Sequence, residues 1–340
     1  MGAATDITSS RPRRSGLILV LRALVSVGLL VFLVLGVPRE ELNELRSGWT
    51  TRDLEWLAGA VALTAAAQVL AAFRWRSALT TLGLHAAIGR LVVLNLAGQF
   101  ISNFLPTTIG GDVIRVRRLG QRLGDVPRCF ASVVIERLTG WIVLPLITLV
   151  AFAINPGLAR LGAASRSALV VAVVTLVVLL LIIVVAELPI VGRRLEGNGA
   201  IRRTLTGLHL GVGEFRRRPR AIGDLITVGV AYQLALVAAT AMAAEAIGID
   251  VSPTAWLAFA PAVLIAQVLP LSIGGLGLRE GALVLYLGPL GVSDAEAILL
   301  GLTLYALNLV VSLVGAPAFL FGWLRAEDRS LSLADTGAES

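Results

Sequence analysis

The sequence predicts an all-α fold, a polytopic integral membrane bundle of helices with two re-entrant hairpins in an inverted repeat. Three observations support this prediction. The 340 residues have a mean hydropathy of +0.86, with 56% hydrophobic and 15% charged residues, which is unusual for a soluble globular chain. Several apolar segments are long enough to cross a bilayer, and one helix-breaking phrase occurs twice inside such segments.

The apolar segments predict the order of the helices. A bilayer core about 30 Å thick requires roughly 20 residues of helix to cross it. The segments lie at residues 17–37, 55–79, 88–106, 127–153, 167–187, 223–248, 254–272 and 295–324. The first is longer than a signal-peptide core and is followed by no small-residue cleavage site, which indicates an uncleaved transmembrane helix.

Arginines between these segments predict the orientation, because cytoplasmic loops carry the excess of basic residues. Basic stretches at residues 11–14, 74–90, 115–128 and 193–220, with a final return inward, predict cytoplasmic termini in a multi-pass cell-membrane protein. Residues 88–106 lie between two of these stretches, so a full crossing there contradicts the rule. A re-entrant hairpin resolves the contradiction, since irregular backbone at that depth is tolerated where it lines a cavity or is buried in protein.

The repeated phrase reads LPTTIGG at residues 105–111 and LPLSIGG at residues 269–275. The offset between the two copies also maps Arg115 onto Arg279. Internal likeness at a fixed offset predicts repeat units, each with a helix, a re-entrant hairpin and a second helix.

The predicted repeat units cover about residues 55–153 and 223–324, and the helix at 167–187 separates them. One intervening helix starts the second unit from the opposite side of the membrane, which makes the repeat inverted. Inverted repeats with broken helices near the midplane characterise many transporters, whose halves present a site alternately to each side.

Each copy of the phrase has the parts of a binding site at a helix N-terminus. Pro106 or Pro270 interrupts the helical hydrogen-bond ladder, and the glycine pair accepts unusual backbone angles. The N-terminus of the next helix has unpaired N–H groups and a partial positive charge, which suit an anion such as phosphate. An arginine one turn later adds a planar guanidinium group, whose geometry matches that of a phosphate. The alternative is that such prolines are common in membrane helices and that the glycines serve close helix packing.

Ionisable residues inside or beside the apolar segments are further candidates for the binding site. Glu136 and Arg137 lie within a predicted membrane helix, where an ionisable residue is a functional candidate by default. The alternative is an interfacial pair whose arginine extends to the lipid phosphates. Asp112 and Glu280 follow the two glycine pairs and either balance the arginines or exchange protons during transport.

Amide residues complete the candidate site. Asn103 and Gln267 are related by the same offset, and with other polar residues they predict a partly hydrated cavity, although such residues often only hydrogen-bond neighbouring helices. No catalytic residue and no metal ligand is predicted. The predicted helix breaks are Pro106 and Pro270, and the predicted substrate-binding residues are Arg115, Arg279, Gly110, Gly111, Gly274, Gly275, Asp112, Glu280, Asn103, Gln267, Glu136 and Arg137.

The composition argues against several classes of function. One cysteine, Cys129, excludes an intramolecular disulfide, and two histidines make a Cys/His metal site improbable, so no cofactor is expected. The net charge of +7 comes mostly from arginines in short loops, which indicates membrane orientation and anionic lipid rather than nucleic acid. No phosphate-binding P-loop motif occurs, so ATP is not expected as the direct energy source.

Three stretches resemble a known family. FLPTTIGGDVIRVRRLG, SVVIERLTG and VLPLSIGGLGLREGALVLYL, in this order and spacing, resemble the flippase-like transmembrane region of lysylphosphatidylglycerol synthases, over about residues 15–325. In the two-part synthases this region resembles the module that moves aminoacylated lipid to the outer leaflet, while a soluble domain transfers the amino acid from charged tRNA. That soluble domain is not recognised in this sequence, so the resemblance implies a stand-alone flippase-like protein and argues against a synthase.

The resemblance extends to individual positions. Asp112 stands where many family members have glutamate. The stretch GLTLYALNLV matches only weakly the aromatic and arginine residues of the family's final helix. The family pattern covers Pro106, Gly110, Gly111, Asp112, Arg115, Glu136, Arg137, Pro270, Gly274, Gly275, Gly277, Arg279 and Glu280.

These observations predict a basic cytoplasmic N-terminus at residues 1–16, a flippase-like transmembrane domain at 17–325 and a disordered cytoplasmic tail at 326–340. We expect a lipid translocase that moves a phospholipid or polyprenyl-phosphate lipid through a central cavity, its headgroup on Arg115, Arg279 and the hairpin N–H groups. The alternatives are an ion-coupled small-anion transporter or channel, and a membrane partner of a lipid-linked glycosyltransferase. The expected partners are membrane lipid as substrate, anionic headgroups, and a lipid-modifying enzyme or a homo-oligomer.

Overall fold

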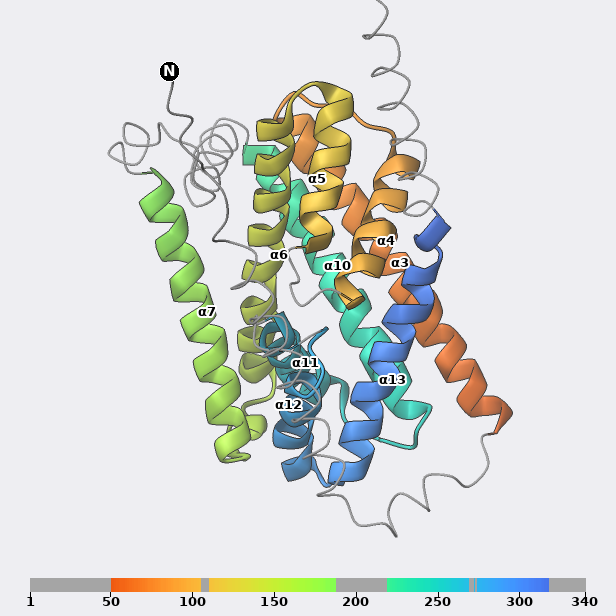
Figure 1. The fold of residues 1–340 in the computed structure, drawn as a ribbon. Coiled ribbons are helices and arrows are strands. Elements are labelled where there is room, and N and C mark those ends of the chain that lie inside the picture. Colours follow the sequence, from red (N-terminus) through yellow and green to blue (C-terminus); the bar gives the residue numbers. More distant parts are fainter. Residues whose placement is uncertain (1–49, 105–109, 188–218, 269–271, 273, 318–340) are drawn as a thin grey trace, which may run out of the picture.

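The computed structural model describes residues 50–104, 110–187, 219–268, 272 and 274–317. Within these ranges the chain forms helices and no strand (Figure 1), which confirms the predicted all-α class. Two short 3-10 turns, η1 (Pro156–Arg160) and η2 (Gly288–Leu290), accompany the α-helices. The α-helices are α3 (Thr51–Thr81), α4 (Ile88–Phe104), α5 (Gly110–Leu123), α6 (Val126–Ile154), α7 (Ala163–Glu187), α10 (Pro219–Glu245), α11 (Pro253–Val268), α12 (Leu278–Leu287) and α13 (Asp294–Leu313).

Five of these helices, α3, α6, α7, α10 and α13, are long and apolar enough to cross a membrane, which confirms a multi-pass membrane bundle. Local sequence sets where several of them begin. Thr50 and Ser293 start α3 and α13 with capping boxes, in which the acidic side chain three residues later bonds back to the cap. Asp125 caps α6, and a proline in its first turn loses no helical hydrogen bond.

Some expectations differ from the structure or lie outside it. Helix α13 ends at Leu313, residues 316–317 are helical again, and the rest of the predicted segment to residue 324 lies outside the described residues. Gly315 lies at this interruption, close to α4: a Cβ there would lie 2.3 Å from the carbonyl carbon of Leu96. The predicted first helix at residues 17–37 and the tail at 326–340 lie outside the described residues.

The two hairpins enter the bundle from opposite ends. Figure 1 shows α4 descending from the upper end and α5 returning to it, whereas α11 and α12 occupy the lower half. This is the arrangement that an inverted repeat requires. The re-entrant insertion of both hairpins into a bilayer stays a prediction.

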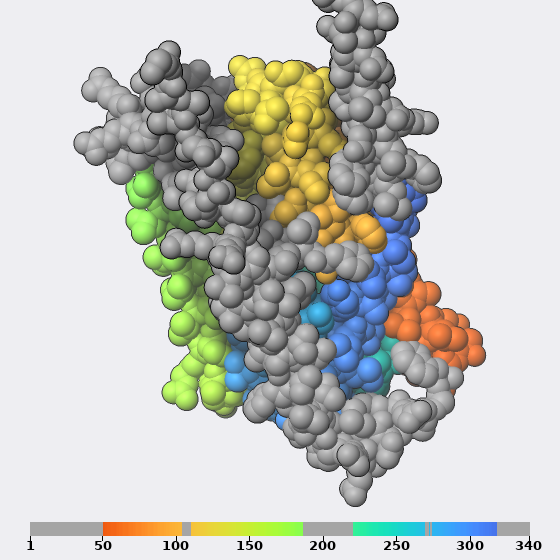
Figure 2. Space-filling view, in the orientation of Figure 1, coloured from red at the N-terminus to blue at the C-terminus, as the bar shows by residue number. Residues whose placement is uncertain are grey.

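Helices α3 and α10, which the predicted repeat relates to each other, pack against each other. Small residues permit this contact: a Cβ on Gly59 would lie 2.0 Å from Cε of Met242, and Ala60 of α3 is buried in one apolar cluster with Ala243 and Ala244 of α10. Helix α7, by contrast, lies at the outer edge (green in Figure 2). Its exposed valines and leucines are suited to lipid contact.

The arrangement of the hairpins predicts that Gln121, near the end of α5, and Gly288, after α12, face opposite sides of the membrane. Both positions are exposed, so a cysteine at either one is available for labelling. Buried Cys129 would be replaced by serine, and single cysteines would be tested in sealed vesicles with an impermeant maleimide. We expect each cysteine to react from one side only, and the two sides to differ. Cysteine at Leu119, which is 1% exposed, should stay unlabelled, and reaction of both test positions from the same side would contradict the inverted repeat.

Candidate functional site

A polar cavity with an empty volume of about 410 Å³, open solvent included, lies where the α4–α5 hairpin packs against α3 and α6. It contains three arginines and two carboxylates, so charge decides its chemistry. Its lining residues are Gln68, Ala71 and Arg74 of α3, Asn95, Gly98, Gln99 and Ser102 of α4, Asp112 and Arg115 of α5, Glu136 and Arg137 of α6, and Tyr232 of α10.

Glu136 connects two buried arginines. Arg74 Nη2 donates to Glu136 Oε1 at 2.6 Å, and Arg115 Nη2 donates to Glu136 Oε2 at 2.7 Å. None of the three side chains is more than 5% exposed. Removing one member of a buried ion pair leaves a charge uncompensated, so both arginines depend on this carboxylate.

Arg115 is held from several directions. Its Nη1 donates to Asn95 Oδ1 at 2.7 Å, and its Nε lies 2.9 Å from Asp112 Oδ1. The guanidinium carbon lies 4.7 Å from the centroid of a Trp75 ring, which adds a cation–π contact. Contacts from four helices therefore fix the guanidinium before any ligand binds.

Asp112 has a second arginine partner, because Arg137 forms a bidentate pair with it. Arg137 Nε donates to Oδ2 at 3.0 Å and Nη2 donates to Oδ1 at 2.9 Å. The Arg137 side chain is 44% exposed, unlike Arg74 and Arg115. Arg137 is therefore the accessible arginine of the cluster.

Three buried donors in this cavity have no partner among the described residues: Nε and Nη1 of Arg74, and Nδ2 of Asn95. The centroid of the Tyr232 ring lies 4.7 Å from the Arg74 guanidinium carbon. This cation–π contact stabilises the positive charge but leaves the N–H groups of Arg74 unpaired. A buried polar group without a partner costs about 1–3 kcal/mol. The described lining residues have no corresponding buried acceptor without a partner, so the cavity is suited to a ligand that accepts hydrogen bonds.

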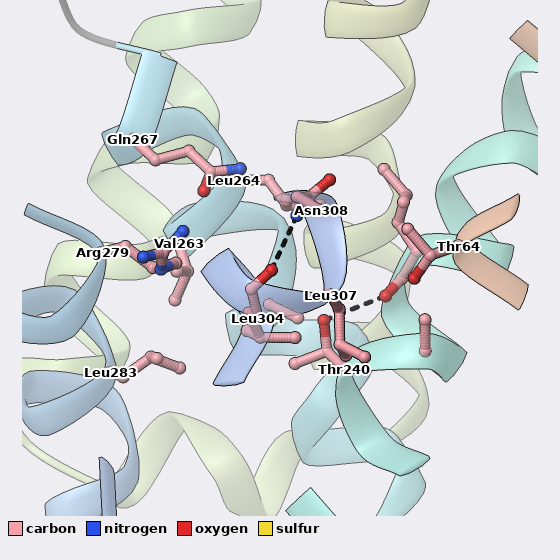
Figure 3. Close-up of a pocket in the computed structure, with 13 residues that line it drawn as sticks. Thr64, Thr240, Val263, Leu264, Gln267, Arg279, Leu283, Leu304, Leu307 and Asn308 are labelled. Atoms are coloured by element: carbon pink, nitrogen blue, oxygen red, sulfur yellow. Dashed lines mark hydrogen bonds between the residues drawn. The ribbon is translucent and has the colours of Figure 1, made fainter. Parts of the chain in front are cut away.

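A second cavity lies beside the α11–α12 hairpin, with an empty volume of about 510 Å³, open solvent included (Figure 3). Most of its lining is apolar. Figure 3 shows Gln267 and Arg279 at one side and Thr64 and Thr240 at the other. This cavity is therefore amphipathic, whereas the first is polar.

Arg279 is neutralised within its own helical turn. Its Nη2 donates to Glu280 Oε1 at 2.6 Å, and Glu280 Oε2 accepts from the N–H of Gly277. Arg279 is 3% exposed and Glu280 is fully buried. A Cβ on Gly301 would lie 2.7 Å from Glu280 Cγ, so the glycine leaves room for the carboxylate. Arg279 thus borders the second cavity with its charge already balanced.

The glycines of the two phrases have different structural roles. A Cβ on Gly111 would lie 2.1 Å from the carbonyl oxygen of Gly98, so Gly111 permits close approach of α5 to α4. Gly274 and Gly275 have φ angles of +60° and +77°, which favour glycine. Gly110 begins α5, as the phrase predicts.

The structure brings half of the predicted substrate-binding residues to the two cavities and separates the two arginines. One central cavity that holds both Arg115 and Arg279 is not what the described residues show, because each arginine borders its own cavity. Asn103 lies at the end of α4, and Pro106 and Pro270 lie outside the described residues. The predicted residues that line the polar cavity are Arg115, Asp112, Glu136 and Arg137, and those that line the second are Arg279 and Gln267.

Arg74 is the main site residue that sequence reasoning missed. With Arg76 it resembles a cytoplasmic loop charge, but it is 3% exposed inside α3. Its position within the apolar segment 55–79 was the available signal, because an ionisable residue inside a membrane helix is a functional candidate. Gln68 and Tyr232 line the same cavity, and no pattern in the sequence marks them.

Comparison with known proteins agrees with this architecture. The family model described as the lysylphosphatidylglycerol synthase TM region matches residues 19–315, which include both hairpins and both arginine sites. No curated protein matches the chain. The family and the apolar helices make this a multi-pass membrane protein connected with lipid handling. The chain belongs to the lysylphosphatidylglycerol synthase transmembrane-region family.

Proposed function

We propose that this protein moves an anionic lipid between the two leaflets of its membrane, with the headgroup phosphate bound in the polar cavity. The observation that carries the proposal is the group of buried donors without a partner, two on Arg74 and one on Asn95. Phosphate oxygens accept hydrogen bonds, whereas an ammonium group only donates them. Arginine and amide N–H groups are therefore matched to a phosphate and not to a cationic headgroup.

The charges of the polar cavity favour one anionic group. Arg74, Arg115 and Arg137 face Asp112 and Glu136, which leaves one positive charge without a partner charge. A phosphodiester has one negative charge and would balance it. In a low-dielectric site this balance contributes far more than it would in water.

A small-anion transporter is the second candidate, because a free phosphate ion would satisfy the same donors. The second cavity favours the lipid, since its mostly apolar lining suits an amphipathic substrate better than a hydrated ion. Uptake of inorganic phosphate into vesicles, without lipid movement, would select the anion transporter.

The proposal predicts that leaflet exchange depends on Arg74 and Arg115. Purified protein in liposomes would be tested with fluorescent phosphatidylglycerol and polyprenyl-phosphate lipids. We expect Arg74→Ala to slow exchange about tenfold or more, since a hydrogen bond to a charged group contributes about 1.5–3 kcal/mol. We expect Arg115→Ala to slow exchange as well, because Arg115 holds the side chain of Asn95 in place. Arg279→Ala should have a smaller effect on headgroup binding, because Glu280 already neutralises Arg279.

Exposed arginines on the same helices are matched controls: Arg76→Ala for Arg74→Ala and Arg117→Ala for Arg115→Ala. Arg74→Lys retains the positive charge beside Glu136 but lacks the planar fork, so it separates charge from geometry. Exchange at the wild-type rate in folded Arg74→Ala protein would contradict the proposed phosphate site.

A further inference from the structure

The two cavities lie on the same pair of helices, one helical turn apart. On α3, Thr64 lines the second cavity and Gln68 lines the polar cavity. On α10, Leu236 and Tyr232 stand in the same relation. One turn of helix rises about 5.4 Å. Along these two helices the cavities are therefore close neighbours.

Tyr305 of α13 contacts the end of α4. The Tyr305 hydroxyl donates to the carbonyl oxygen of Asn103 at 3.3 Å, and Asn103 Nδ2 donates to Ser312 Oγ at 2.9 Å. Each of the two residues directly follows one that lines a cavity: Ser102, just before Asn103, lines the polar cavity, and Leu304, just before Tyr305, lines the second. The Tyr305–Asn103 contact therefore joins a residue next to one lining to a residue next to the other.

The same tyrosine also contacts the other hairpin. The Arg279 guanidinium carbon lies 5.6 Å from the centroid of the Tyr305 ring. A Cβ on Gly274 would lie 3.2 Å from Tyr305 Cε2, so this glycine lets the ring pack closely against the backbone there. Tyr305 therefore connects the inner ends of the two hairpins through its hydroxyl on one side and its ring on the other.

We propose that Tyr305 is the partition between the two cavities and that its hydrogen bond to Asn103 keeps the partition closed. A polar group moves from one cavity to the other when this hydrogen bond breaks. The passage of a lipid headgroup through the partition rests on the proposed function, whereas the partition itself does not.

The partition can be tested without any lipid transport. Asn308 lines the second cavity, so Asn308→Cys in a Cys129→Ser background reports on access to it. A charged, membrane-impermeant methanethiosulfonate would be added to oriented vesicles from the α5 end or the α12 end. We expect faster labelling from the α12 end in protein with Tyr305. Tyr305→Phe keeps the ring on Arg279 but removes the hydroxyl, and should raise labelling from the α5 end about threefold to tenfold.

Tyr286→Phe is the matched control, because it removes the hydroxyl of a second tyrosine, which is buried against Phe259. Its labelling rates should stay unchanged. Equal rates from the α5 end with Tyr305 and with Tyr305→Phe would overturn the proposal, as would an equal rise in Tyr286→Phe.

Lipid exchange measured in the same variants separates the two proposals. A Tyr305-dependent change in labelling without lipid exchange in wild-type protein would support the partition and contradict the proposed function. If the wild type exchanges lipid and the labelling rates are the same with Tyr305 and with Tyr305→Phe, the proposed function is supported and the partition is overturned.

Discussion

Replacing Glu136 with glutamine is expected to lower the free energy of unfolding by about 3–5 kcal/mol. Glu136 is the shared counterion of Arg74 and Arg115, and all three side chains are buried. Glutamine keeps the shape but not the charge, so two guanidinium groups remain in a low-dielectric region with their mutual repulsion uncompensated. Thermal or denaturant unfolding of purified protein in detergent micelles measures the loss.

Glu55→Gln is the matched control, because Glu55 is exposed near the start of α3 and its change should alter stability by less than about 0.5 kcal/mol. The double variant Arg74→Leu with Glu136→Gln removes one cation together with the carboxylate, and leaves Arg115 with Asp112. Its loss should be smaller than the sum of the single losses by about 0.5–3 kcal/mol. A loss below about 1 kcal/mol in Glu136→Gln alone would show that the buried cluster does not depend on this carboxylate.

The helices were predictable because apolar length is a local property of the chain. The segment 127–153 predicts α6 to within one residue at each end, and 88–106 predicts the start of α4. The partner of Glu136 was not predictable. Arg74 lies 62 residues away, and contact between them depends on how α3 packs against α6, which no local pattern encodes. The sequence placed Arg137 beside Glu136, but in the folded helix Arg137 pairs with Asp112 instead.

The two hairpins balance the charge of their buried arginines with different residues. The offset that relates the two phrases maps Glu136 and Arg137 onto Leu300 and Gly301, so the second half lacks the carboxylate that pairs with Arg115. Glu280 supplies one to Arg279, and the glycine at position 301 leaves the space that it occupies. The predicted inverted repeat would place equivalent residues on opposite sides of a pseudo-two-fold axis, and the separate cavities of Arg115 and Arg279 agree with that prediction.

Gly111→Ala should lower the free energy of unfolding by about 1–3 kcal/mol, because the new methyl group has no space. Its Cβ would lie 2.1 Å from the carbonyl oxygen of Gly98 and 2.5 Å from Oγ of Ser102. A serine side chain can rotate away, but the backbone oxygen of α4 cannot move without separating the two helices of the hairpin. Denaturant unfolding in detergent micelles measures the loss.

Gly98→Ala is the control from the other side of the same contact. Its Cβ would lie 3.2 Å from the carbonyl oxygen of Gly111, a distance that a shift of a few tenths of an ångström relieves, so its loss should be much smaller. Equal effects at the two positions would contradict the close approach of α4 and α5 at Gly111. The comparison also bears on the repeated phrase, since a large loss at Gly111 alone shows that this glycine is required for helix packing. The anion-binding role would then rest on Arg74, Arg115 and Asn95, whose donors do not depend on the phrase.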